Sequence, residues 1–216
     1  MSLRGAFKSL MPLIAALILI VCFTIAAFII EVYRYPLWIR EGGIIETLSA
    51  LGYFLCALFM MYKGGWQYIK KYHYFFMLVV AFGLRELDFD ERFTEIGVLQ
   101  SKFYSSAEIT LFTKLVGAIV VITLLYIIAA IIKNHLKNLV PKLKLFSPVY
   151  IGVVTTLFFL VFVKTIDGVA RKLLGVDVSI EYQTSLLFET LEEVLELGIP
   201  LLIFSTLIIF YQKSSI

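Results

Sequence analysis

Residues 9–30 read SLMPLIAALILIVCFTIAAFII, a run of 22 residues without a charged side chain. An α-helix rises about 1.5 Å per residue, so this run can cross the roughly 30 Å hydrocarbon core of a bilayer. Two basic residues precede the run, as in a signal peptide, but it is longer than the apolar region of a typical signal peptide. The sequence therefore predicts a retained first transmembrane helix over 10–30.

Similar apolar stretches recur along the chain of 216 residues, which is 61% hydrophobic and only 16% charged. Soluble domains carry about 25% charged residues, so water is not the main solvent of this protein. No linker separates the stretches, and we expect an all-α, polytopic membrane protein with a single transmembrane domain over residues 1–216. Its bundle of about six transmembrane helices is predicted at roughly 10–30, 43–62, 72–90, 109–132, 145–165 and 188–211.

Two further segments mix charged and apolar side chains, namely residues 91–107 and 168–175. This mixture is typical of a segment that lies along the membrane surface. We expect short interfacial helices there, on the outer side of the membrane.

The charged residues divide unevenly between the two ends of the expected helices. One end has nine basic residues and all 16 acidic residues of the chain. The other end has ten basic residues and no acidic one: Arg4, Lys8, Lys63, Lys70, Lys71, Lys133, Lys137, Lys142, Lys144 and Lys213. By the positive-inside rule, this basic end and both termini are cytoplasmic. We expect the protein in a cell membrane, the inner or plasma membrane of a bacterium.

Two of the expected spans reach full length only if they carry charged residues into the membrane. Residues 72–84 are 13 uncharged residues, which rise only about 20 Å and leave Arg85 and Glu86 about 10 Å below the outer hydrocarbon boundary. Residues 197–212 are 16 uncharged residues, which leave Glu196 about 6 Å deep. A charge at the bilayer centre costs at least about 2.5 kcal/mol, and such residues usually face the bundle interior. These groups are therefore expected to meet one another.

We predict one polar network formed by the second, third and sixth spans, with further charged residues at its rim. In the sixth span, Glu189, Glu193 and Glu196 follow an i, i+4, i+7 spacing that places them on one helix face. The predicted ligand-binding residues are Glu46, Arg85, Glu86, Asp88, Glu193, Glu196, Lys114, Lys164 and Asp167.

Both acidic segments also have a purely structural interpretation. Residues 85–92, RELDFDER, could be a salt-bridge cluster that joins helix ends, or a snorkelling surface. Residues 189–196 could form solvated first turns, where acidic side chains are favourable with the helix dipole. The position of Glu196 favours a buried site, because a span that begins after it is too short to cross.

The types of residue present limit the possible chemistry. Carboxylates suit Ca²⁺, Mg²⁺ or Mn²⁺, and the candidate ligands for such a metal are Glu189, Glu192, Glu193 and Glu196. Zinc and histidine-dependent hydrolysis are disfavoured, because both histidines, His73 and His135, lie at the opposite end of the helices from the acids. The sequence predicts no cofactor, and no basic aromatic segment indicates nucleic-acid binding.

Three functions fit these observations, and the lipid bilayer is a partner in all of them. The first is an outward-facing acidic site that binds or transports a cation or small solute. The second is an accessory or structural subunit that docks a membrane-protein partner. The third is a membrane-embedded enzyme acting on a lipid head group, with Glu46 and Glu196 as an acid/base pair and Arg85 holding the phosphate.

Overall fold

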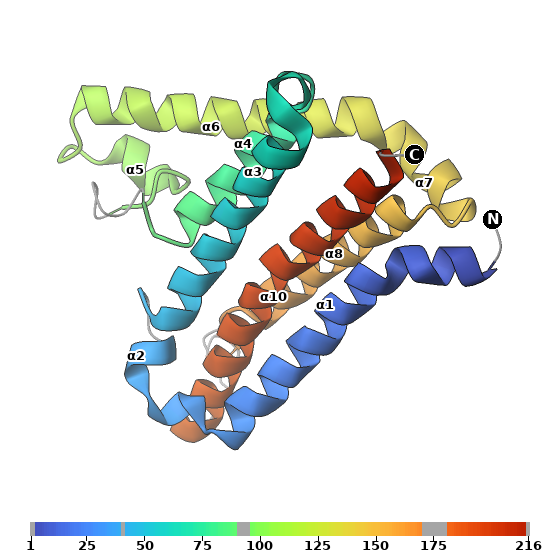
Figure 1. The fold of residues 1–216 in the computed structure, drawn as a ribbon. Helices are drawn as coiled ribbons and strands as arrows, with labels where there is room; N and C mark the ends of the chain where they lie inside the picture. Colours follow the sequence, from blue (N-terminus) through green and yellow to red (C-terminus); the bar gives the residue numbers. More distant parts are fainter. Residues whose placement is uncertain (1–2, 40–41, 90–95, 170–180, 215–216) are drawn as a thin grey trace.

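The computed structural model describes residues 3–39, 42–89, 96–169 and 181–214, and within these ranges it contains helices and no strand (Figure 1). The all-helical prediction is thus confirmed for the described residues. Within these described ranges, five helices are long and apolar enough to cross a membrane. They are α1 (Leu3–Ile29), α3 (Ile44–Lys71), α6 (Leu111–Ile131) with its continuation, α8 (Pro148–Ile166) and α10 (Tyr182–Ser214).

The third expected span, 72–90, corresponds to a shorter helix, α4 (His73–Arg85), which has 13 residues. A helix of this length rises about 20 Å and does not cross a bilayer alone. The chain leaves the helix in a turn over residues 86–89, where Asp88 has a φ of 46°. This left-handed conformation is one that Asp tolerates better than most residues, and it ends the helix. Six crossing helices are therefore not confirmed.

Four of the expected spans are exceeded by their helices. α1 begins before residue 10 and α3 continues beyond residue 62. α6 continues through a π-helical segment, Ile132–Leu136, into α7 (Lys137–Lys144), although this continuation is rich in lysine. α10 begins at Tyr182, six residues before the expected span. Hydropathy therefore indicates the apolar part of each segment, while the helix itself extends further.

Short elements connect the long helices at the acidic end. A 3-10 turn, Val32–Arg34, and the single-turn helix α2 (Pro36–Ile39) follow α1, and α5 (Ser101–Ser105) precedes α6. α5 falls in the expected interfacial segment 91–107, which is described from residue 96. Most of the second such segment, 168–175, lies outside the described residues.

α10 is the central helix of the arrangement. It packs against α1, α3 and α8, while α4 packs against α3 on one side and α6 on the other. Figure 1 shows α1, α8 and α10 side by side, α6 running obliquely across the α3–α4 pair, and the two chain ends at the same end of the bundle. α3 and α10 run in the same direction, so their N-terminal halves meet.

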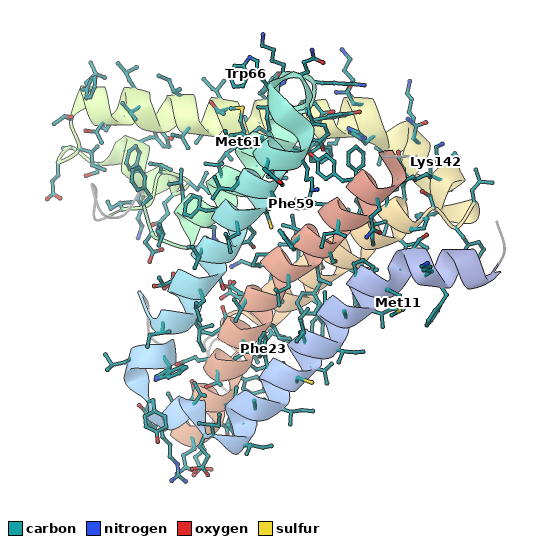
Figure 2. All side chains as sticks on the ribbon, in the orientation of Figure 1. Met11, Phe23, Phe59, Met61, Trp66 and Lys142 are labelled. Carbon is teal, nitrogen blue, oxygen red and sulfur yellow. The ribbon has the colours of Figure 1, made fainter. Side chains whose placement is uncertain are left out.

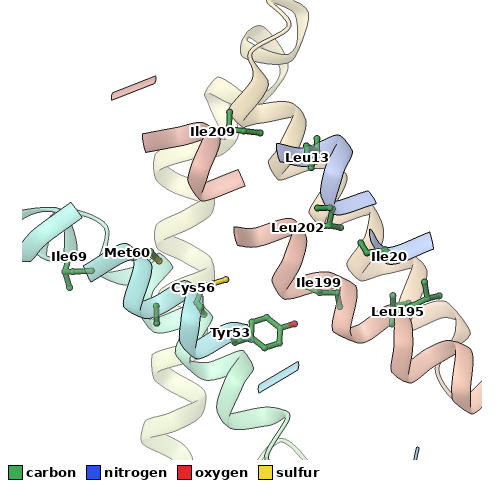
Figure 3. Close-up of a cluster of buried hydrophobic side chains, with 14 residues drawn as sticks. Leu13, Ile20, Tyr53, Cys56, Met60, Ile69, Leu195, Ile199, Leu202 and Ile209 are labelled. Carbon is green, nitrogen blue, oxygen red and sulfur yellow. The ribbon is translucent and has the colours of Figure 1, made fainter. Parts of the chain in front are cut away.

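The core between α3, α4 and α10 contains Tyr53, Cys56, Met60 and Leu202, each at most 2% exposed (Figure 3). α3 and α10 make a close contact at a glycine of α3. A Cβ atom placed on Gly52 would lie only 2.9 Å from the Cβ of Pro200. This contact brings the two acid-bearing helix halves together.

Candidate functional site

Four helices bring charged side chains to one region of the molecule. These side chains come from the first turn of α3, the end of α4, the end of α8 and the middle of α10. We call the carboxyl groups of this region the acidic cluster; it consists of Glu46, Glu86, Asp167, Glu192, Glu193 and Glu196. Electrostatic interactions connect its members across the helices.

Arg85 and Glu196 form an ion pair between α4 and α10. Their nearest nitrogen and oxygen atoms, Nη2 and Oε1, are 3.9 Å apart, at the long end of the range for such pairs. The Glu196 side chain is 14% exposed, whereas the Arg85 side chain is 53% exposed. The structure therefore brings together the two groups that the sequence placed inside the membrane, but it does not lock them in a tight bidentate pair.

Glu86 is the most enclosed member of the cluster. The residue is 6% exposed, and its Oε2 atom is buried with no hydrogen-bond partner among the described residues. Its charged neighbours include Glu196, Glu46 and Arg85. The Oγ atom of Ser49 on α3 is also buried and has no hydrogen-bond partner among the described residues. Buried polar atoms are almost always hydrogen-bonded, so such exceptions indicate where a proton, water or ion binds.

Glu193 lies among other carboxylates. The charged groups that act on it most strongly are Glu196, Glu46, Glu192 and Glu86, which are all acidic. Like charges repel strongly where water is excluded. The centre of the acidic cluster is therefore a place where binding a positive charge relieves repulsion.

Asp167 at the end of α8 and Glu192 of α10 are electrostatic neighbours. The backbone N–H of Gly168 donates to Glu192 Oε2 at 3.3 Å. Two ionised carboxylates repel each other, so a proton on one of them stabilises the pair. Lys164 pairs with Asp167 and acts electrostatically on Glu196, which places it at the rim of the cluster.

Pro200 changes the backbone directly below the acidic cluster. It has no N–H to donate to the carbonyl oxygen of Glu196, four residues earlier in α10. The Cys56 thiol donates to the carbonyl oxygen of Pro200 itself at 3.4 Å, across from α3. Glu196 therefore contributes a carboxyl group and a backbone oxygen that lacks its helical donor.

Comparisons with protein-family models, curated proteins and solved structures find no match to this chain. The site is therefore interpreted from its own geometry and chemistry.

Some predicted site residues lie elsewhere or do not assemble. The Nζ atom of Lys114 donates to the carbonyl oxygen of Ser106 at 2.7 Å, on the side of α6, and no described contact joins it to the acidic cluster. Glu189 accepts a hydrogen bond from Ser185. In the described ranges no three His, Cys, Asp or Glu side chains could hold a metal ion, so the four candidate glutamate ligands do not converge.

Asp88 follows α4 and acts electrostatically on Glu86, so it lies beside the acidic cluster. The remainder of the acidic run, residues 90–92, lies outside the described residues.

The sequence interpretation missed two uncharged residues of α3. Ser49 and Tyr53 follow Glu46 at i+3 and i+7, so all three share one helix face. Tyr53 is 2% exposed and interacts electrostatically with Glu86 and Glu196. Its ring reaches from α3 toward α10 in Figure 3. Their spacing from Glu46 could have indicated that they face the site. They lie within an apolar stretch, however, where only charged side chains were considered as site residues.

Proposed function

We propose that this protein crosses a cell membrane, with both termini in the cytoplasm, and binds or transports a cation through the acidic cluster. The cluster lies near the outer end of the apolar layer, above the 16 uncharged residues 197–212. We further propose that the cation is a proton, taken up alone or together with a small solute.

The excess of buried carboxyl groups carries this proposal. Glu193 has four carboxyl groups as its strongest charged neighbours, and Glu86 has a buried oxygen without a partner among the described residues. Arg85 and Lys164 are the cations that act on Glu196. An isolated ionised carboxylate in an apolar medium is very costly, so binding a positive charge there is strongly favoured.

The geometry favours a proton over a metal ion. A metal needs several oxygen ligands at close range, and no set of three candidate ligands meets in the described ranges. A proton needs only one carboxyl group and a hydrogen-bond acceptor. Asp167 and Glu192 are neighbouring carboxyl groups of this kind, because a proton on either one removes their mutual repulsion.

Proton flux in reconstituted vesicles tests the transport part of the proposal. The vesicles contain a pH-sensitive dye and have an outward potassium gradient. Valinomycin lets potassium leave, and the resulting inside-negative potential drives proton entry, which the dye reports as acidification. We expect Glu193→Gln and Glu196→Gln to abolish the flux, because each removes a titratable group of the acidic cluster. Glu189→Gln, on the same helix but bonded to Ser185, is the matched control and should retain it. Equal flux in all four proteins would refute transport through this site.

Proton binding without transport is measured separately. Purified protein in unbuffered detergent solution is titrated with acid, and the protons bound are counted. Glu193→Gln and Glu196→Gln should each bind fewer protons than the Glu189→Gln control over the pH range in which the wild type titrates. Identical curves for the cluster variants and the wild type would refute the binding part as well.

The accessory-subunit alternative is favoured by one feature of α6. This helix exposes large apolar side chains along its length, among them Leu115, Ile119, Ile122 and Leu125. A membrane-protein partner would cover such a surface, but lipid chains cover it equally well. The enzyme alternative needs Glu46 and Glu196 to act as a pair, and both of them are electrostatic neighbours of Glu193.

A further inference from the structure

An apolar groove lies between α3 and α10, on the other side of the Gly52–Pro200 contact from the acidic cluster. Its volume is about 450 Å³. The side chains that line it include Leu55, Leu58, Phe59 and Tyr62 of α3 and Pro200 and Phe204 of α10. Figure 2 shows Phe59 at this junction of the two helices. The groove opens to the outer surface of the bundle, since Leu55 and Leu58 are 50% and 60% exposed.

The groove has the length of one membrane leaflet. It extends along α3 from Gly52 to Tyr62, which corresponds to a rise of about 15 Å. That is half of the roughly 30 Å hydrocarbon thickness. A single acyl chain of one leaflet therefore matches the groove in length and polarity.

A positive charge lies at the end of the groove away from the acidic cluster. The Lys63 ammonium is 5.4 Å from the centroid of the Tyr62 ring, which forms the last part of the groove wall. Two more lysines, Lys70 and Lys71, follow on the same helix, with no acidic residue between. Lysines at the cytoplasmic surface attract anionic lipid head groups, each contributing about 1 kcal/mol.

The backbone turns the segment after Lys63 away from the axis of α3. Gly65 has a φ of 64°, a left-handed conformation that breaks the helix there. Trp66, next in the chain, is 68% exposed, and the Lys70 ammonium is 5.7 Å from the centroid of its ring. Exposed tryptophan beside lysine is typical of the interface between lipid and water. The groove thus ends where a lipid head group would lie.

We propose that the groove and Lys63 form a binding site for one anionic phospholipid. An acyl chain lies in the groove between Leu55 and Phe204, and the phosphate lies beside Lys63. The site depends on the protein being in a membrane, but not on proton binding by the acidic cluster.

Native mass spectrometry of the delipidated protein tests this site. Phosphatidylglycerol and phosphatidylcholine with identical acyl chains are added separately, and their affinities are compared. We expect the wild type to prefer phosphatidylglycerol. Lys63→Gln should weaken phosphatidylglycerol binding about fivefold and phosphatidylcholine binding less, because both lipids carry the phosphate but only phosphatidylglycerol has a net negative charge. Leu55→Trp should weaken both lipids because it fills the groove.

Matched controls are available on the α6–α7 segment. Lys137→Gln removes an exposed lysine of the same basic end, and Leu125→Trp enlarges a side chain that is 61% exposed. Neither should change lipid preference or affinity. If Leu55→Trp does not fold, Lys63→Gln decides, since Lys63 is an exposed residue.

Equal affinity of the wild type for both lipids, or an unchanged preference in Lys63→Gln, would overturn the proposal. A stable dimer that Leu55→Trp dissociates would also overturn it, in favour of a second copy of the chain in the groove.

Discussion

Replacing Gly52 with alanine puts a methyl group where α3 approaches α10. The new Cβ atom would lie 2.9 Å from Cβ and 3.0 Å from Cγ of Pro200. Carbon atoms pack best at about 3.5–4.0 Å, so the two helices would have to separate by roughly 0.6 Å or more. The proline ring is fully buried and cannot rotate out of the way.

Two opposing terms set the size of the effect. Overpacking a buried contact costs typically about 1–3 kcal/mol. Alanine gains about 1 kcal/mol over glycine inside a helix. We therefore expect the free energy of unfolding to fall by about 1 kcal/mol in Gly52→Ala, and by more in Gly52→Leu. Helix propensity alone predicts the opposite sign.

Thermal unfolding in one detergent measures both variants against the wild type. Leu51→Ala, at a neighbouring residue that is 52% exposed, is the control for a change on α3 that does not face α10. Proton binding should also fall in Gly52→Ala, because the separation moves Glu46 away from Glu193. A Gly52→Ala protein as stable as the wild type, or more stable, would refute the close approach of the two helices.

Three further predictions concern other parts of the chain. Glu86→Leu should raise the midpoint of thermal unfolding and lower proton binding, because it removes a buried carboxyl group with an unpartnered oxygen. A lower midpoint would show that this group has a stabilising partner. Tyr74→Phe should cost about 1 kcal/mol of unfolding free energy, because it removes the 2.8 Å hydrogen bond between Tyr74 Oη and His135 Nε2; an unchanged midpoint would argue against this link between α4 and the π-helical segment. Two single cysteines, placed in a protein without the natural cysteines, test whether α10 crosses the membrane. Lys213→Cys should react with an impermeant maleimide only from the cytoplasmic side, and Tyr182→Cys only from the outer side. Labelling of both from one side would refute the crossing by α10.

The long helices could be predicted because each contains a long apolar run, although the runs in α3 and α10 reach crossing length only when Glu46 and Glu196 are included. The end of α4 could not be predicted in the same way. Apolar residues recur beyond the uncharged run 72–84, at Leu87 and Phe89, so hydropathy gives no sharp end to the helix. The helix ends because Asp88 adopts a left-handed backbone conformation, which a hydropathy pattern does not predict. The helical extension into Lys137–Lys144 was missed for the opposite reason, because lysine is compatible with helix as well as with solvent.

Counting residues from the basic end placed Arg85 and Glu196 at similar depth, and the structure has them in contact. The same count put Lys114 at a span edge without indicating which face of α6 it occupies. Its bond to Ser106 depends on the fold of residues 96–110, which a depth argument does not address. That Asp167 and Glu192 are neighbours likewise depends on how α8 and α10 pack, which residue counting does not predict.

The depth proposed for Glu196 in α10 has an electrical consequence. A voltage across a membrane falls mainly over the layer that excludes water, and one charge moved through 100 mV changes energy by about 2.3 kcal/mol. With residues 197–212 in the apolar layer, as proposed, Glu196 would be about 6 Å from the outer boundary, or roughly one fifth of the layer. A proton arriving there from outside would sense about one fifth of the voltage, or about 0.5 kcal/mol at 100 mV. Proton occupancy of the site would then depend only weakly on the membrane potential. A proton moving onward past Pro200 would cross the remaining four fifths of the voltage.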